Sequence, residues 1–263
     1  MKQILTIFIL LCHQLLTAQN TNYKVTYKQF LSYGQKLQRD AILYIKENQP
    51  TVMHTPMAST VELSDREKFE KPENNDTNLS QSVSFHVVTS NFSYSNFPDT
   101  YIMVNQKENK NTSIDFIGTK RGFLVNDDQL KYTWKITNET KKIKNYTCYK
   151  ATTTFRGNNF EAWFTPEIPI NAGPWKWYGL PGLIVEAYDT EKKHIFLLEK
   201  LEKLTEEVPF PIKNFKNITL KEYVVELELF HSGNIGELDR DTTVTSNYKR
   251  NFIEKKYEWE ENK

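Results

Sequence analysis

The sequence predicts a mainly β protein: a strongly curved antiparallel sheet, half-barrel or sandwich-like, with little helix. Aromatic residues make up 13% of the chain, and aromatic and β-branched side chains favour strands. About ten short runs with strand-like patterning follow one another, and most are joined by links of turn length. No helical pattern interrupts residues 82–200, so the crossover helices of a parallel α/β sheet are missing.

The first strands are expected at 21–30 and 41–47, where apolar and polar residues alternate. Residues 48–80 lose this pattern and end in an Asn/Asp-rich tract, which predicts a long surface loop. The turn at Asp127-Asp128 predicts a hairpin between 122–127 and 130–137. The other expected strands are 82–88, 100–106, 112–119, 145–157, 160–166, 182–190 and 193–204.

The C-terminal part has a different pattern. Residues 219–230 fit either a helix or an edge strand, and Thr219 with Glu222 has the spacing of a helix capping box. Residues 231–263 combine many charges with scattered apolar side chains. They are expected either to dock as a final strand or to stay mobile.

The N-terminus predicts export. Lys2 precedes an apolar stretch, 4–11, and Thr17-Ala18 is a plausible cleavage point, so residues 1–18 are expected to be a signal peptide. No later run reaches the roughly 18 apolar residues of a membrane helix. The mature chain, 19–263, is expected to be a single domain located in the periplasm, at the outer membrane or outside the cell.

The charge balance of the chain bears on the kind of partner it can bind. The chain has 34 basic and 33 acidic side chains, and loss of the signal peptide leaves the two equal. A nucleic-acid partner is therefore not expected, because proteins that bind nucleic acids present a basic surface.

Cys12 lies in the predicted signal peptide, so the mature chain keeps only Cys148 and has no internal disulfide. We expect it to be a small buried apolar side chain.

No motif assigns a catalytic residue, a metal or a cofactor. The chain contains no nucleotide-binding glycine loop and no nucleophile elbow. None of the remaining histidines stands at a metal-ligand spacing from another or from Cys148. They are His54, His86, His194 and His231.

Paired carboxylates leave one catalytic alternative open. Glu161 and Glu167 flank Trp163, and Glu186 and Asp189 follow shortly afterwards. Two carboxyls beside an aromatic ring would suit glycan hydrolysis if they were roughly 5–9.5 Å apart. Charged residues on exposed strand positions are the commoner explanation.

The stretch "GPWKWYGLPGLIVEAYD" at 173–189 is the most distinctive in the chain. Pro181 followed by Gly182 predicts a type II turn, so Gly179, Pro181 and Gly182 are expected to form a structural corner. The aromatic residues near it are expected either to fill the core or to line a binding surface. The proposed ligand-binding residues are Trp163, Trp175, Trp177 and Tyr178.

Residues 179–184 read G-L-P-G-L-I and follow Cys148-x-Lys150-Ala151, Ala162-Trp163-Phe164-Thr165, Ile168-Pro169 and Gly173-Pro174. This order resembles the GLPGLI family, exported proteins of Bacteroidota-type bacteria, most strongly over 130–188. The family has no established activity. It looks related to a β-rich module attached to some secreted glycan-cleaving enzymes, and its Trp-containing curved sheet is similar to carrier half-barrels. The resemblance implies an accessory or binding role.

The leading hypothesis is therefore a non-catalytic exported β-domain that binds an unidentified ligand or protein at the cell envelope. An envelope hydrolase with a carboxylate pair is one alternative. A hydrophobic-ligand carrier, with a cavity lined by Phe155, Trp163 and Leu183, is another. A metal site centred on Cys148 is a further, weaker idea.

Overall fold

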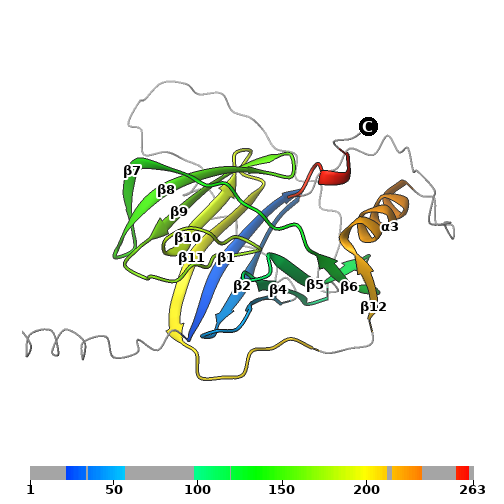
Figure 1. Ribbon diagram of the computed structural model, residues 1–263, viewed down its shortest axis with the longest axis horizontal. Helices are drawn as coiled ribbons and strands as arrows, with labels where there is room; N and C mark the ends of the chain where they lie inside the picture. The colour runs from blue at the N-terminus through cyan, green and yellow to red at the C-terminus, as the bar shows by residue number, and fades with distance from the viewer. Residues whose placement is uncertain are drawn as a thin grey trace, which may run out of the picture.

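The computed structural model describes residues 22–33, 35–56, 98–118, 120–211, 215–232 and 253–260. These residues form one 12-stranded sheet, a helix near its end and a short 3-10 turn (Figure 1). The strands are β1 (Tyr23–Tyr33), β2 (Gln35–Ile45), β3 (Thr51–Thr55), β4 (Thr100–Asn105), β5 (Lys110–Ile117), β6 (Arg121–Asp127), β7 (Lys135–Ile143), β8 (Tyr146–Phe155), β9 (Asn158–Thr165), β10 (Leu183–Asp189), β11 (His194–Lys203) and β12 (Lys216–Thr219). The helical elements are α3 (Leu220–Ser232) and η2 (Glu258–Glu260).

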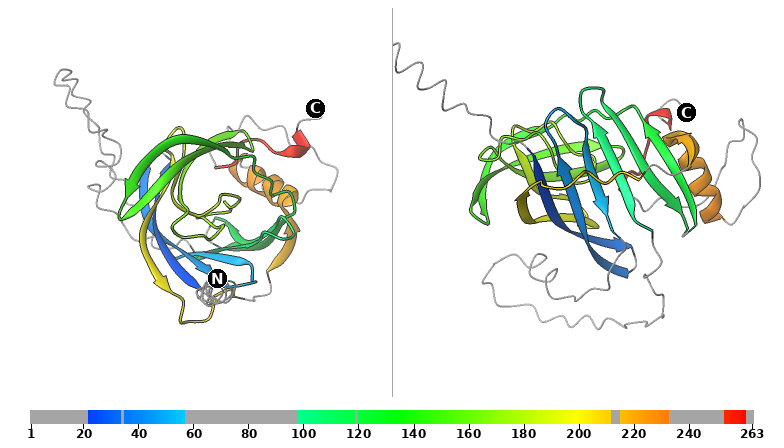
Figure 2. Two further views of the ribbon diagram at one scale, coloured as in Figure 1. Left: turned by 60° about the vertical axis from the view of Figure 1, so that its left-hand side comes forward. Right: turned by 90° about the horizontal axis from the view of Figure 1, so that it is seen from below.

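The sheet order is β12-β6-β5-β4-β3-β2-β1-β11-β10-β9-β8-β7. All pairs are antiparallel except β12 with β6. The sheet curls strongly into an open bowl, so β12 and β7 are its two edges (Figure 2). The predicted fold class, a mainly β protein with a curved antiparallel sheet and little helix, is confirmed.

Two of the differences from the sequence-based expectations concern β3 and the expected hairpin after β6. β3 occupies Thr51–Thr55, within the range expected to be a loop; its five residues lie between Pro50 and Pro56, too few to show a clear alternation, yet Val52 and Met53 are buried. The hairpin between 122–127 and 130–137 is wrong, because β6 pairs with β5 and β12, whereas β7 pairs with β8. Residues 128–134 instead cross the bowl, anchored by the fully buried Leu130.

Several expectations lie outside the described residues. They are the signal peptide at 1–18, the part of the predicted loop from 57 to 80, the strand at 82–88, and most of the tail after 232.

A segment between β9 and β10, residues 166–182, lies inside the bowl (Figure 2); we call it the plug. Its Trp177 is 1% exposed and packs edge-to-face against Phe160 and Phe196, with ring centroids 5.1 and 5.7 Å away. The Tyr27 hydroxyl donates a hydrogen bond to the Ile184 carbonyl at 2.7 Å, which ties β1 to the start of β10. The plug and strands β8–β11 therefore form a solid aromatic core.

The helix α3 closes the other end of the bowl. Its first turn carries the expected capping box: the Thr219 backbone N–H donates to Glu222 Oε2 at 2.8 Å, and the Glu222 N–H donates to Thr219 Oγ1 at 3.2 Å. Leu220 and Val224 pack with Phe123 and Val125 of β6. Of the two alternatives left open for 219–230, the structure has the helix.

Candidate functional site

Polar side chains gather on the inner face of β5 and β6. Asn111 lies directly opposite Asp127 in the register of these strands, so both side chains share the inner face. Both are almost completely buried, at 2% and 3% exposure. This part of the bowl thus holds polar groups where the β8–β11 part holds aromatic rings.

Arg156 reaches this region from a tight turn. The register pairs Phe155 with Asn158, which leaves Arg156-Gly157 as a two-residue hairpin loop between β8 and β9. Both residues have positive φ, 45° and 73°, as a type I′ hairpin turn requires. Glycine meets this demand without strain, and the turn aims the Arg156 guanidinium at Asp127.

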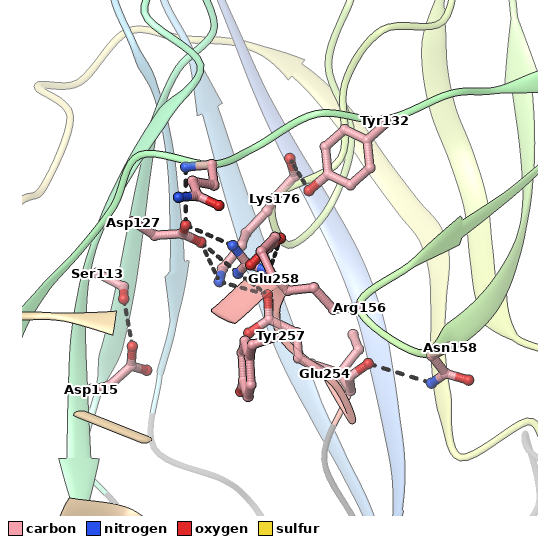
Figure 3. A network of polar contacts seen from close by, with 12 residues as sticks. Ser113, Asp115, Asp127, Tyr132, Arg156, Asn158, Lys176, Glu254, Tyr257 and Glu258 are labelled. Atoms are coloured by element: carbon pink, nitrogen blue, oxygen red, sulfur yellow. Dashed lines mark hydrogen bonds and ion pairs between the residues drawn. The ribbon is translucent and has the colours of Figure 1, made fainter. Parts of the chain in front are cut away.

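Arg156 forms a network with four other charged side chains (Figure 3). Its guanidinium donates two parallel hydrogen bonds to Asp127, each 2.8 Å long, and further bonds to Glu254 Oε1 at 2.8 Å and Glu258 Oε1 at 2.9 Å. Lys176 of the plug lies 3.1 Å from Glu254 and 3.5 Å from Asp127. The network joins the sheet, the plug and residues 253–260, which we call the C-terminal strap.

The network stabilises the charged forms of Asp127 and Lys176. Burial opposes the ionisation of Asp127, but Lys176 and Arg156 outweigh it and lower its pKa to about 2. Burial likewise disfavours the charged form of Lys176, yet Glu254 and Asp127 leave its pKa raised. The buried charges of Arg156, Lys176, Asp127 and Glu254 therefore balance.

An open pocket with a volume of about 530 Å³ lies beside this network, at the rim of the bowl. We call it the rim pocket. Its buried lining residues are Asn111, Asp127, Arg156 and Leu220, which form the floor. The more exposed lining residues, at the walls and mouth, are Lys110, Thr112, Asn126, Asp128, Gln129, Thr219, Lys221 and Trp259.

Asn111 is an unusual member of the floor. Within the described residues, neither its Oδ1 nor its Nδ2 has a hydrogen-bond partner, although both atoms are buried. A buried polar group left unpaired costs about 1–3 kcal/mol, and such groups in folded proteins usually have a reason. Both atoms have less than 1 Å² of accessible surface, so they lie beneath the surface of the rim pocket.

Trp259 contributes an aromatic wall. Its ring stacks on Tyr257, with centroids 4.6 Å apart and planes at 3°. The strap that carries both rings is held by Lys255 and Lys256, whose backbone N–H groups donate to the Arg156 carbonyl at 2.8 and 3.0 Å. The same turn therefore places Arg156 on the floor and the strap beside it.

The aromatic residues expected to bind a ligand lie elsewhere. Trp175 and Trp177 are buried inside the plug, at 8% and 1% exposure, with ring centroids 5.1 Å apart. Tyr178 is partly exposed, and its hydroxyl donates to the Leu130 carbonyl at 2.9 Å. Trp163 is 7% exposed beneath Lys141, whose Nζ lies 4.3 Å from the ring centroid. None of the four lines the rim pocket.

The corner at Gly179, Pro181 and Gly182 leads from the plug into β10. The Gly182 N–H donates to the Leu180 carbonyl at 2.8 Å, which closes a turn one residue tighter than a type II turn. Gly182 has φ +156°, and a Cβ there would lie 2.1 Å from the Thr165 carbonyl oxygen. Only glycine fits this approach.

The four carboxylates considered for catalysis all have partners; two of them, Glu161 and Glu186, both lie near Tyr188, whose pKa is raised by burial first and then by their charges. Glu186 pairs with Lys141 at 2.7 Å, and Glu161 pairs with Lys150 at 3.0 Å. Glu167 accepts a hydrogen bond from the Thr147 backbone N–H, and Asp189 accepts one from the His194 N–H. Each therefore has a structural partner of its own.

Cys148 is a buried free thiol, and burial raises its pKa to about 11. No group of three or more His, Cys, Asp or Glu residues in the described ranges is placed to hold a metal ion. None of the helices that the structure describes is long and apolar enough to cross a membrane.

Sequence reasoning missed the rim pocket because its floor comes from distant segments, residues 111, 127 and 156, and its aromatic wall from residue 259. One local signal was present. Gly157 followed by two asparagines marks the turn, and the residue before that glycine, Arg156, is the one that the turn places on the floor.

The chain matches the family model described as N-glycanase peptide, N-terminal domain, over residues 60–223. Two solved structures of PNGF-II, in C2 and P21 space groups, align at 18% and 16% identity with a TM-score of 0.49 each. Each alignment covers 80% of this chain and 33% of the other, so this chain spans about a third of the length of PNGF-II.

A LolA superfamily protein from Nitrosomonas europaea aligns at 9% identity and a TM-score of 0.28, covering 73% of this chain and 89% of that one. No curated protein matches the chain. These comparisons do not bear on the resemblance to the GLPGLI family, which stays a prediction.

Proposed function

The chain belongs to the N-glycanase peptide N-terminal domain family, and from this premise we propose that it is an exported, non-catalytic domain that binds glycans at the cell envelope through the rim pocket. The family description associates the domain with a glycan-cleaving enzyme. The proposal concerns recognition and not cleavage.

The observation that carries the proposal is the composition of the rim pocket. Sugar rings have apolar C–H faces and edges rich in hydroxyl groups. They suit a concave site that combines an aromatic wall with a few fixed polar groups. The rim pocket offers Trp259 as the wall and the more exposed side chains of Asn126 and Gln129 as polar groups.

The charges of the floor favour binding over catalysis. A general acid needs a proton to donate near neutral pH, but Asp127 has a pKa of about 2 and is ionised there. Both of its oxygens already accept hydrogen bonds from Arg156. The floor is therefore rigid and held in one protonation state, as a recognition surface requires.

The predicted signal peptide supports a location outside the cytoplasm, where glycans of the envelope and of the surroundings are accessible. The resemblance to the exported GLPGLI family supports the same location, and the accessory role that it implies agrees with glycan binding.

Calorimetric titration of the purified protein tests the proposal. An N-glycosylated peptide and the oligosaccharide released from it are the probes, and mass spectrometry of the recovered probes checks that they remain intact. Trp259→Ala should lower the affinity at least about tenfold, since stacking and its desolvated area are lost. Tyr149→Ala, which changes an exposed aromatic residue outside the pocket, is the matched control and should bind normally.

Absence of binding to both probes would refute the proposal, and so would equal affinity of the parent protein and Trp259→Ala. Cleavage of a probe by the parent protein, lost in Glu161→Gln or Glu186→Gln, would restore the hydrolase hypothesis.

A further inference from the structure

We propose that the inner face of the sheet holds a second binding site, in which the guanidinium group of Arg39 takes the carboxylate of a small organic acid and Asp115 takes a hydroxyl or ammonium group of the same molecule. Neither residue lines the rim pocket. The inference therefore goes beyond the proposed function and does not depend on glycan binding.

The register of β1 and β2 places Arg39 on the inner face. Tyr27 points into the core of the bowl, where its hydroxyl bonds to the Ile184 carbonyl. Gln29 lies two residues further along β1 and therefore on the same face. Arg39 is directly opposite Gln29 in the register of the two strands, so its side chain also points inward.

Asp115 reaches the same interior from β5. It lies on the same face of the strand as Asn111, four residues earlier. The charges of Lys176 and Glu254, in the plug and in the strap, both act on its pKa. Arg39 and Asp115 also act on each other's pKa. The two side chains therefore approach each other across the inner face, over β3 and β4.

The guanidinium group of Arg39 has unused hydrogen-bonding capacity. Its Nε donates to Gln29 Oε1 at 2.8 Å, which fixes the orientation of the planar group. Within the described part of the chain, this side chain makes no other hydrogen bond and no ion pair. The N–H groups of both Nη atoms therefore remain available.

The surroundings of Arg39 disfavour its charge. Burial lowers its pKa to about 10, and the charge of Asp115 offsets this effect only in part. Charges inside proteins are ordinarily paired, because an unpaired one loses its hydration without compensation. An anion on the guanidinium would complete a pairing that the described residues leave open.

Asp115 offers the second contact. Its Oδ2 accepts a hydrogen bond from the Ser113 hydroxyl at 2.5 Å (Figure 3). Its Oδ1 has no partner among the residues that the structure describes. This oxygen can accept a hydrogen bond from a ligand.

Both groups are accessible to a ligand. Arg39 and Asp115 are partly exposed side chains. The buried atoms that lack a partner include neither the Nη atoms of Arg39 nor Asp115 Oδ1, so these atoms retain accessible surface. In this respect they differ from the carboxamide atoms of Asn111, which have almost none.

The chemistry of the two groups selects the class of ligand. The two Nη atoms of a guanidinium match the two oxygens of a carboxylate, in the bidentate arrangement typical of arginine. The carboxyl group of Asp115 repels a second negative charge nearby, so a monoanion suits the site better than a dianion such as sulfate. The free oxygen of Asp115 favours a hydroxyl or ammonium group beside the carboxylate. A hydroxy acid or an amino acid meets both demands.

The experiment titrates the purified, isotope-labelled protein with acetate, lactate, alanine and sulfate at constant pH and ionic strength, and follows the Nε–H signals of the arginines by NMR. The Arg39 signal should move in a saturable manner with lactate or alanine. That ligand should bind about fivefold more tightly than acetate, as expected for one additional hydrogen bond, and more tightly than sulfate. The signal of Arg121, an exposed arginine already paired with Glu226, should stay in place.

Variants separate the two contacts. Arg39→Met should abolish the binding, followed by the backbone signal of Gln29, and Arg39→Lys should weaken it about tenfold because the charge stays but the fork is lost. Asp115→Ala, which leaves Arg39 intact and serves if the Arg39 variants do not fold, should bind lactate and alanine no more tightly than acetate. Arg121→Met is the matched control and should behave as the parent.

The inference is overturned if no carboxylate moves the Arg39 signal, if sulfate binds as tightly as the best carboxylate, or if Arg39→Met keeps the binding. Equal affinities of acetate, lactate and alanine for the parent protein would overturn the role of Asp115. These outcomes are distinct from a failure of the rim pocket, because Trp259→Ala should bind the acids as the parent does.

Discussion

The inner face of the curved sheet has two regions of different character, one aromatic and one polar. Toward β8–β11, the plug fills the inner face with rings, and Trp175 and Trp177 are almost without exposure. Toward β5 and β6, the same face carries Asn111, Asp127 and the charge network, and a pocket of about 530 Å³ stays open.

The contrast separates the part that makes the fold from the part available for a ligand. Hydrophobic burial is non-directional and rewards complete filling. Polar groups in the interior demand specific partners, and each unpaired one is costly. The unpaired carboxamide of Asn111 and the unpaired Oε2 of Glu258 are therefore costly groups in this polar interior.

The largest loss of folding stability is expected from substitutions in the aromatic interior. Trp177→Ala should lower the free energy of unfolding by about 3–5 kcal/mol, as for other large aromatic truncations in a core. Trp177→Phe should cost much less, because it keeps a ring and removes an indole Nε1 that has no hydrogen-bond partner. Urea denaturation measures both. Equal effects of the two substitutions would contradict the packing role of the plug.

Removal of a charge in the polar interior should cause the next largest loss of folding stability. Asp127→Asn breaks the balance of the four buried charges and should cost about 3 kcal/mol, because it leaves Arg156 without its bidentate partner. Asp128→Asn, at the neighbouring exposed position, is the control and should change the unfolding free energy by no more than about 0.5 kcal/mol. A similar result for both would show that the network does not stabilise the fold.

The pH dependence of stability should report on His194, which lies on the inner face of β11. Burial, and then the nearby charge of Lys255, lowers its pKa to about 3, against about 6.5 in an unfolded chain. The unfolded state thus binds more protons between these values, and stability falls as the pH falls below about 6.5, by up to about 1.4 kcal/mol per pH unit.

His194→Gln should remove this contribution. The pKa of Asp189, which burial raises, affects stability in the opposite sense but is common to both proteins. The difference between parent and variant, measured by denaturation from pH 7 to pH 4, isolates the histidine. If stability depended on pH in the same way for the parent protein and for His194→Gln, the burial of His194 as a neutral side chain would be contradicted.

The smallest loss of stability is expected at Thr219, which lines the rim pocket and caps α3. Thr219→Ala removes the side chain that caps α3 and should cost about 1 kcal/mol. Thr219→Ser keeps the hydroxyl and should cost less. Thermal unfolding followed by circular dichroism compares them, and a serine variant as unstable as the alanine variant would argue against the cap.

Local patterns predicted much of the sheet. Alternation located most strands, and the pair Thr219 and Glu222 predicted the start of α3 because a capping box is a local interaction. The path of residues 128–134 was not predictable in this way. Those residues look like a strand but are held by long-range contacts, such as the bond from the Tyr132 hydroxyl to the Lys176 carbonyl.

The site was less accessible to sequence reasoning than the fold. The aromatic stretch at 175–178 attracted the binding hypothesis because Trp and Tyr serve both as core and as ligand surface, and composition does not distinguish the two. The burial of Trp175 and Trp177 is set by strands far away in the chain. Asn111 looks like any strand asparagine until Asp127 is placed opposite it and its lack of partners becomes visible.

The most direct measurement of the central claim is an NMR titration that follows the side-chain indole signals of the five tryptophans while a glycan is added. The account predicts that the Trp259 signal moves in a saturable manner and that the Trp175 and Trp177 signals stay in place. Movement of the plug tryptophans without Trp259, or no movement at all, would contradict the assignment of ligand binding to the rim pocket.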